Sequence, residues 1–429
     1  MVDVRLGLAL VAFTTRTAPQ EMSPDKQRIA IVSLLVFAFF CAIAPSGIFP
    51  RVLAAFLIRA TINEQASRNT ENESFEKLVA RAQAALDAEQ IPEAIRLYEH
   101  ATKLRPNWSE GWWHLGTLFF DAQRFGEARN AFAHFVATER KQPGPGFGML
   151  GLSEFQLANY LQAQAAIEKG LKLGIGTDRA FVREVLIHDG LLNAKSGKPE
   201  IALQRLTLAA NQIAAANPDA PKDAVFADLK LLDAFGVAAL RIPNLPDKLP
   251  LEQLPIVRLA GRAQAFIALQ DRVAADAELK QLVTLYGSQS GVNYMNGVFM
   301  LKEHPPLAVD AFRREIQVSP SDASPRIQLA LEFLRTGDYQ QGLRYAQEAV
   351  ALVPNNFVAH VAHGRLLLET GKTDGAIEEL RLAVKLAPGS PDAHFALSRS
   401  LTAAGRDREA AHERSEFERL KALTDATDE

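Results

Sequence analysis

The distribution of apolar, small and turn-forming residues repeats every 34 positions in the C-terminal part of the chain. Prolines recur at Pro320, Pro354 and Pro388, and glycines recur at Gly337, Gly371 and Gly405. Large apolar residues and small residues follow in the same register: Phe333, Leu367 and Leu401; Ala330, Gly364 and Ser398; Gly342, Ala376 and Ala410. Five sets that share one register indicate a tandem array of a single structural unit.

Each set has a physical reason to recur in a unit made of two antiparallel helices. The small residues allow the helices to approach closely, and the large apolar residues fill the space between them. Glycine permits the turn between the helices, and proline ends the second helix. One such hairpin cannot bury its apolar face alone, so neighbouring hairpins must stack to form a core. The pattern therefore predicts an all-α solenoid.

Earlier parts of the chain show the same order of residues. One unit has Trp112, Leu115, Gly116 and Phe119 on its first helix, and then Ala128 and Phe132 on its second. The preceding unit supplies Leu78, Ala82, Ala94, Tyr98, Ala101 and Pro106. This signature resembles the tetratricopeptide repeat, and the resemblance covers most of residues 75–422. It implies a right-handed superhelix whose concave wall is built from the first helix of each hairpin and which holds segments of partner proteins.

The middle of the chain departs from this register. Five prolines bracket one apparent helix, over 223–240, between residues 217 and 250. We interpret this segment as an irregular joint between two sub-arrays. The final unit has the charged Arg414 where an apolar residue is expected, which suits a terminal cap. The predicted organisation is an N-terminal region at 1–28, an apolar segment at 29–48, a linker at 49–74, a first array at 75–216, the joint at 217–250, a second array at 251–422 and a tail at 423–429.

An uncharged apolar run extends over 29–48 and follows Lys26 and Arg28. A basic flank before such a run is typical of a secretory signal, and about 20 residues can also cross a bilayer. Ala42 and Ala44 resemble a cleavage site, but Pro45 would follow the cut. A cleaved signal and an uncleaved anchor both remain open, as does a start at Met22 instead of Met1. Either reading places the array outside the cytoplasm, anchored to the membrane or secreted, and periplasmic in a bacterium.

Composition limits the classes of function. The chain has 429 residues, of which 48% are hydrophobic and 23% are charged, as in a folded protein. Its net charge of −3 gives no general attraction to nucleic acid. The one cysteine, Cys41, lies in the apolar run, so the array has no thiol for a disulfide or for catalysis.

The chain shows no motif that predicts an enzyme. No glycine-rich phosphate loop or nucleophile elbow is present, since Gln289 replaces the serine that the elbow requires. We therefore expect no catalytic residue, cofactor or small-molecule substrate. His360, His363 and His394 could converge on a metal, but His360 and His394 occupy the slot that Trp112 fills earlier. We favour a packing role for these histidines and predict no metal site.

The resemblance implies which residues face the groove, namely those one place after the positions that pack between helices. Family members that grip peptide carboxylates need lysine at set groove positions, where this chain has Val79, Trp113 and Gly148, so that role is rejected. An apolar, partly acidic segment is a better ligand, because aromatic and arginine side chains are typical of binding hot spots. The predicted groove residues are Trp113, Thr117, Phe120, Leu152, Phe155, Ile327, Leu331, Arg335, Val361, Arg365, Phe395 and Arg399.

These observations predict a non-catalytic scaffold that binds protein or peptide segments in the cell envelope and meets the membrane through its N-terminal segment. Two alternatives stay open. The chain could be the regulatory or substrate-recruiting arm of an enzyme complex, or a protein that binds metal through its histidines.

Overall fold

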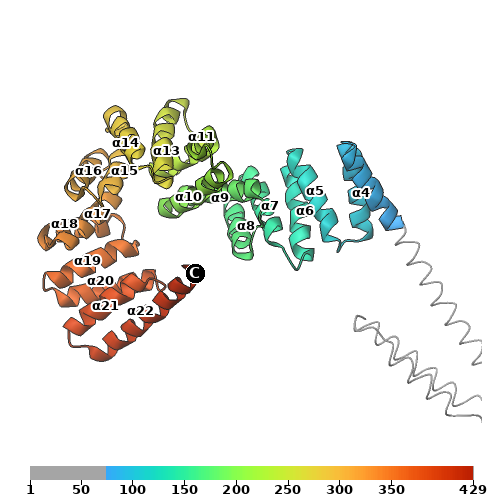
Figure 1. Ribbon diagram of the computed structural model, residues 1–429. Coiled ribbons are helices and arrows are strands. Elements are labelled where there is room, and N and C mark those ends of the chain that lie inside the picture. The colour runs from blue at the N-terminus through green and yellow to red at the C-terminus, as the bar shows by residue number, and fades with distance from the viewer. Residues whose placement is uncertain (1–73, 429) are drawn as a thin grey trace, which may run out of the picture. The chain divides into compact units, whose positions relative to one another are not determined.

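The computed structural model describes residues 74–428, with side chains up to residue 423 (Figure 1). The predicted apolar segment at 29–48, the region before it and nearly all of the linker lie outside these residues. Within the described part, no helix is both long and apolar enough to cross a membrane. One compact unit ends at Gly111 and a second begins at Trp112.

The described residues form helices and no strand. Residues 74–87 are the first helical stretch, and two short 3-10 helices, η1 (Pro246–Lys248) and η2 (Leu251–Gln253), interrupt the middle of the chain. The remaining helices are α4 (Ile91–Leu104), α5 (Ser109–Asp121), α6 (Phe125–Thr138), α7 (Gly144–Gln156), α8 (Tyr160–Leu173), α9 (Arg179–Lys195), α10 (Pro199–Ala216), α11 (Pro221–Ala227), α12 (Leu229–Ala239), α13 (Leu254–Ala268), α14 (Arg272–Tyr286), α15 (Val292–Met300), α16 (Pro305–Val318), α17 (Ser324–Thr336), α18 (Tyr339–Leu352), α19 (Phe357–Glu369), α20 (Thr373–Leu386), α21 (Pro391–Ala403) and α22 (Asp407–Asp428).

The small residue of each first helix lies against a large residue of the second, as the sequence register predicts. A Cβ atom added to Gly116 would lie 2.5 Å from the ring of Phe132. The same addition at Gly364 would lie 2.5 Å from Leu380. Contacts this short have no room for a methyl group, so glycine sets how closely the two helices of a hairpin approach. Equivalent pairs are Gly151 with Ile167, Gly190 with Leu206, and Gly297 with Phe312.

The segment at 217–250 contains two helices where the sequence predicted one. Asp228 breaks the stretch between α11 and α12, because its backbone is not helical and its side chain accepts a hydrogen bond from Leu231 N. An aspartate in this position caps the start of a new helix. The prediction of a single helix over 223–240 is therefore wrong.

Helix α12 packs against α9, α10 and α13, so the middle segment is part of the core. A single cluster of buried apolar side chains runs through it, from Leu186 on α9 to Met295 on α15. The contact of α12 with α13 is unusually close. A Cβ atom at Gly236 would lie 2.0 Å from Val257 O, and one at Gly261 would lie 2.0 Å from Leu232 O. Backbone touches backbone here, which only glycine allows.

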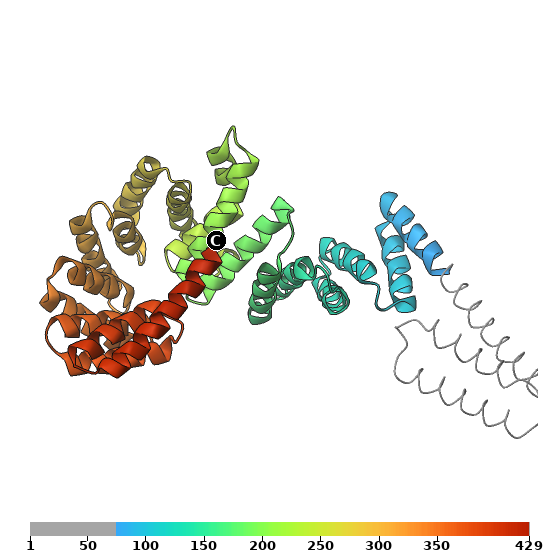
Figure 2. The same cartoon turned by 60° about the horizontal axis from the view of Figure 1, so that its bottom comes forward.

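Three hairpins, α17–α18, α19–α20 and α21–α22, end the second unit and stack beside one another (Figure 2). The first helices of these hairpins contact each other directly, α17 with α19 and α19 with α21. Arg414 on α22 is exposed, as expected of a terminal helix. Helix α22 runs to Asp428 and so includes most of the stretch that was expected to be a tail.

Candidate functional site

The predicted groove residues of the second array lie on the adjoining first helices α17, α19 and α21. We call Leu331, Arg335, Arg365, Phe395 and Arg399 the C-terminal face. Leu331, Arg365 and Arg399 share one register, 34 residues apart, and so occupy equivalent places on successive helices. Arg335, Phe395 and Arg399 are exposed, whereas Leu331 and Arg365 are half-buried.

Two of the three arginines on this face are held by carboxylates. Arg335 donates two hydrogen bonds to Glu332 on its own helix, at 2.9 and 2.6 Å. This pairing raises the pKa of the Arg335 guanidinium further. Arg399 on α21 reaches Glu369 on α19, with Nη2 3.2 Å from Oε1. This second pair bridges two successive hairpins.

Arg365 differs from its two neighbours. Within the described residues it forms no ion pair and no hydrogen bond through its side chain, although it lies between Arg335 and Arg399 in the row of first helices. Its guanidinium therefore keeps all five donors for a ligand. A carboxylate would be the best partner, because arginine binds that group through two parallel hydrogen bonds.

Three predicted groove residues are buried in the core and cannot line a groove. Leu152, Ile327 and Val361 are 2%, 8% and 6% exposed. Ile327 clusters with Ala359 of the next first helix, and Val361 clusters with Ala393 and Leu397 of α21. The adjoining first helix covers each of these side chains, so their prediction as groove residues is wrong.

Phe395 shares the register of Ile327 and Val361, yet it is 46% exposed. No further first helix follows α21 among the described residues to cover its ring. The rings of Phe395 and Phe417 lie 5.2 Å apart. The C-terminal face therefore ends in an accessible aromatic side chain beside Arg399.

The predicted groove residues of the first array are mostly engaged in packing. The half-buried Trp113 lies 5.7 Å from the ring of Phe132 and 5.2 Å from that of Phe135. Phe120 contacts Phe125 in the same way, at 5.3 Å. Thr117 is half-buried, and its hydroxyl donates to carbonyl oxygens of its own helix. These side chains support the array and offer only partial surfaces to a ligand.

Phe155 lies against a charged cluster that the sequence did not reveal. Its ring is 4.4 Å from that of His188, which is buried on α9. The Nδ1 atom of His188 lies 2.8 Å from Glu184 O, and the Glu184 side chain pairs with Lys230 of α12. Burial, assisted by the positive charge of Lys230, lowers the pKa of His188 to about 4. This imidazole is therefore neutral at physiological pH.

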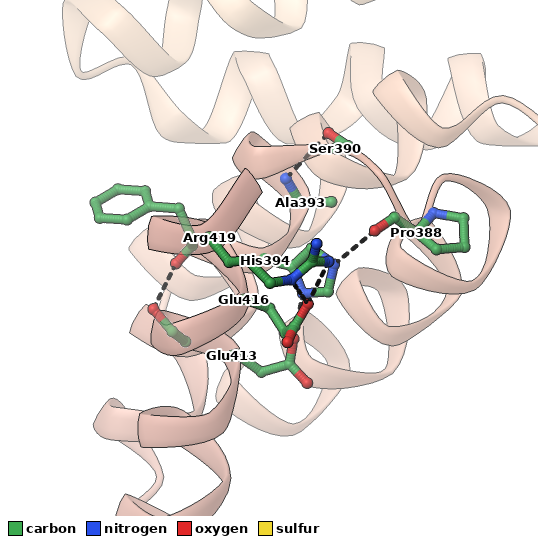
Figure 3. A network of polar contacts seen from close by, with 9 residues as sticks. Pro388, Ser390, Ala393, His394, Glu413, Glu416 and Arg419 are labelled. Carbon is green, nitrogen blue, oxygen red and sulfur yellow. Dashed lines mark hydrogen bonds and ion pairs between the residues drawn. The ribbon is translucent and has the colours of Figure 1, made fainter. Parts of the chain in front are cut away.

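His360 and His394 occupy packing slots, and both of their ring nitrogens have partners. In His360, Nδ1 lies 2.5 Å from Glu379 Oε2 and Nε2 lies 2.9 Å from Pro354 O. In His394, the corresponding distances are 2.6 Å to Glu413 Oε2 and 3.1 Å to Pro388 O (Figure 3). The part of the chain that the structure describes contains no group of three potential metal ligands.

The sequence analysis did not predict the carboxylates that pair with these histidines and with Arg399, although the spacing of the residues contains some information about them. Glu379 and Glu413 each follow their histidine by 19 residues, so the two pairs repeat with the 34-residue register. Glu369 precedes Arg399 by 30 residues, which is one repeat less about one helical turn. Comparing charges across repeats would have revealed the first relation, whereas the second occurs once, because the residues 34 places earlier are Arg365 and Arg335.

Comparison with known proteins agrees with this architecture. The tetratricopeptide repeat family matches residues 79–140, 327–391 and 361–413. Proteins with tetratricopeptide repeats generally mediate interactions between proteins. No curated protein matches the chain.

Two of the solved structures that match parts of the chain are of named proteins. MamA from Desulfovibrio magneticus RS-1 is 18% identical, with a TM-score of 0.36, over 40% of this chain and 97% of that one. YrrB, described as a TPR protein with an unusual peptide-binding site, is 18% identical, with a TM-score of 0.34, over 39% of this chain and 87% of that one.

Proposed function

We propose that this protein is an interaction scaffold that holds a segment of a partner protein on its C-terminal face. The observation that carries the proposal is the half-buried Arg365, which has no partner among the described residues, between two arginines on neighbouring helices. Arg335 and Arg399 are already paired with carboxylates of the chain. A ligand carboxylate at Arg365 would complete the same pattern.

The side chains of the C-terminal face indicate which residues a bound segment should contain. A suitable segment combines acidic side chains, for Arg365 and its neighbours, with an apolar side chain for the exposed ring of Phe395. Aromatic and arginine side chains give the largest contributions to binding in protein interfaces. The segment is therefore apolar and partly acidic. Trp113, Thr117, Phe120 and Phe155 give the first array a smaller, apolar contact surface.

Peptide binding tests this proposal directly. Fluorescent peptides with alternating acidic and aromatic residues would be titrated with the full-length protein, beside peptides in which lysine replaces each acid. We expect Arg365→Ala to weaken binding of the acidic peptides by about tenfold or more, because a hydrogen bond to a charged group contributes about 1.5–3 kcal/mol. Arg408→Ala, which changes an exposed arginine on α22, is the matched control.

Two results would count against the proposal. One is equal affinity for the acidic and the lysine peptides, and the other is an equal effect of Arg365→Ala and Arg408→Ala. Phe395→Ala should also weaken binding, and it should do so for peptides that contain an aromatic residue more than for peptides that lack one.

We also propose that the array lies outside the cytoplasm, anchored to the membrane or released by cleavage. The basis is the sequence alone, with Lys26 and Arg28 before the apolar run at 29–48. An alkaline phosphatase fusion after residue 74 should be active in bacterial cells. The mass of the purified protein would distinguish a cleaved signal from an anchor. An inactive fusion would reject export.

A further inference from the structure

The C-terminal face is apolar at one end and basic at the other. Leu331, Arg365 and Arg399 occupy equivalent places on the successive first helices α17, α19 and α21. On α17, Leu331 and Leu334 are half-buried, and both pack against a cluster of buried apolar side chains. On α19 and α21 the place of Leu331 is taken by an arginine. The three helices therefore present one apolar contact followed by two basic ones.

The ion pairs of the face strengthen this difference. Buried Glu332 accepts two hydrogen bonds from Arg335, so Arg335 is already neutralised within α17. Arg365 on α19 has no partner among the described residues. Within the same part of the chain, Arg399 donates only through Nη2, to Glu369, which leaves its other N–H groups for a second carboxylate. Of the three arginines on the face, those on α19 and α21 are thus the ones that can pair with an added carboxylate.

The spacing of the three first helices determines how often a segment that crosses them can make contact. Helix α17 contacts α19, and α19 contacts α21. Side chains interlock at both contacts, since Ile327 clusters with Ala359, and Val361 clusters with Ala393. Helices packed in this way lie about 8–10 Å apart. A bound segment must therefore present a matching side chain toward the same side at intervals of about 8–10 Å.

A polyproline II segment meets this requirement with few residues. It has three residues per turn and rises about 3.1 Å per residue, so every third side chain points the same way at intervals of about 9 Å. In a β-strand, side chains return to one side every second residue, at intervals of about 7 Å, which is too short. An α-helix needs about seven residues, or roughly 10.5 Å, to return to the same side.

Conformational entropy favours the polyproline II segment over the α-helix. A polyproline II segment crosses the three first helices with about seven residues, whereas an α-helix needs roughly fifteen. Each residue that is fixed on binding costs conformational entropy, and polyproline II is already a major conformer of unfolded chains. The shorter and partly preformed segment therefore binds at the lower cost.

We propose that the bound segment is an extended polyproline II chain with the order apolar–x–x–acidic–x–x–acidic. The apolar residue lies on Leu331 and Leu334, the middle acid pairs with Arg365 and the outer acid pairs with Arg399. Phe395 stands about one helical turn from Arg399 on α21, so an aromatic residue of the segment belongs beside the outer acid. This inference rests on the proposed binding function and specifies the ligand of the same face.

Peptides of equal composition test the order and the spacing. Each fluorescent peptide contains one leucine, two glutamates and a phenylalanine beside an outer glutamate, and is titrated with the full-length wild-type protein in detergent. The reference peptide has leucine, glutamate and glutamate at every third position. A second peptide keeps this spacing but has leucine between the two glutamates. Two more keep the reference order, with the three residues at every second or every seventh position.

The reference peptide should bind most tightly. The peptide with the central leucine should bind about tenfold more weakly, because it leaves Arg365 without a carboxylate, and reversing the direction of the peptide cannot restore that contact. The two altered spacings should weaken binding by a similar factor. Equal affinity for the reference and central-leucine peptides, or binding at either altered spacing that matches the reference, would overturn the proposal.

Proline at the intervening positions separates the possible conformations. Proline favours polyproline II and is excluded from the interior of an α-helix. The reference peptide with proline at these positions should bind at least as tightly as the same peptide with alanine there, because its bound conformation is already formed. Binding that proline weakens tenfold or more would overturn the proposal.

Variants of the protein test which arginine contacts which acid. With Arg365→Ala, replacing the middle glutamate of the peptide by glutamine should have little further effect, whereas replacing the outer glutamate should weaken binding as it does for the wild type. Arg399→Ala should give the reverse result. With Arg408→Ala, the matched control, both replacements should keep their full effect. Equal coupling of Arg365 to the two glutamates would overturn the assignment.

Failure of this inference and failure of the proposed function give different results. If acidic peptides bind more tightly than their lysine counterparts, but equally in every order and spacing, the face binds acidic segments and the inference is wrong. If no acidic peptide binds more tightly than its lysine counterpart, the proposed function is wrong as well. The peptide comparisons use the wild-type protein, so they do not depend on the folding of a variant.

Discussion

At the scale of single residues, Glu315 shows how one buried carboxylate organises the start of a neighbouring helix. It lies on α16 and is fully buried. Its oxygens accept hydrogen bonds from the backbone N–H groups of Gly291, Asn293 and Tyr294, at 2.7, 3.1 and 3.2 Å. These donors stand at the beginning of α15, where a helix has free N–H groups and attracts negative charge. Glu315 therefore caps a helix that has no side-chain cap of its own.

Removing this carboxylate should destabilise the protein strongly. We expect Glu315→Ala to lower the free energy of unfolding by about 2–4 kcal/mol, because three buried N–H groups lose their acceptor and a cavity opens. Urea unfolding of the full chain measures the loss. Glu303→Ala, which removes a carboxylate from a half-exposed surface pair with Arg272, is the control and should cost less than about 1 kcal/mol. Equal losses in the two variants would contradict the capping role.

The sequence could not have identified this cap. Capping residues are recognised when they immediately precede the helix that they stabilise. Glu315 instead follows the start of α15 by more than 20 residues and reaches it only because the hairpin folds back. The packing slots of His360 and His394, in contrast, could be predicted, because the repeat register assigned them.

At the scale of helices and hairpins, glycine sets the spacing at several close contacts between helices. The 34-residue register predicted the glycines inside each hairpin, such as Gly116 and Gly364, because they recur. It did not predict the crossing of α12 and α13 at Gly236 and Gly261, which belongs to no repeat. Packing positions that recur in every repeat can be recognised in a single sequence. A helix contact that occurs only once has no second copy to compare with and cannot be recognised in this way.

The crossing of α12 and α13 should not tolerate a methyl group. We expect Gly236→Ala to destabilise the protein by about 2–4 kcal/mol or more, because the new Cβ atom would lie 2.0 Å from Val257 O and would force the helices apart. Thermal unfolding followed by circular dichroism would detect this loss. The change should outweigh the gain of roughly 1 kcal/mol in helix propensity that alanine brings.

Gly126→Ala provides the control, since a Cβ atom at Gly126 on α6 would meet nothing within 4 Å. This variant should be neutral or slightly stabilised. If Gly236→Ala behaved like Gly126→Ala, the close contact between α12 and α13 would not exist in solution.

At the scale of the whole molecule, the buried histidines differ in the groups that surround their rings. His188, in the middle of the chain, is neutral because burial disfavours its charge. His360 and His394, in the last two hairpins, are also buried, and each ring lies beside a carboxylate and a backbone carbonyl oxygen. Burial also lowers the pKa of His363, which lies on α19 with His360.

The sequence predicts the fold much better than it predicts the binding partner. Packing positions repeat, so a single chain shows them several times and its repeats confirm one another. Binding positions need not repeat. Ile327, Val361 and Phe395 share one register, yet only Phe395 is accessible, because no first helix follows its own among the described residues. Accessibility of this kind depends on where a hairpin stands in the stack, which local pattern does not encode.

The decrease in the free energy of unfolding at acid pH should depend on His188. Its pKa is about 4 in the folded protein and near 6.5 when unfolded, so between these values the unfolded chain binds more protons and stability falls as pH falls. The shift corresponds to roughly 3 kcal/mol, lost between pH 6.5 and pH 4. His188→Gln should lack this part of the acid destabilisation in urea unfolding of the full chain. His134→Gln, which changes an exposed ring stacked on Trp112, should retain it. Parallel pH profiles for His188→Gln and the wild type would show that the buried imidazole is not the group responsible.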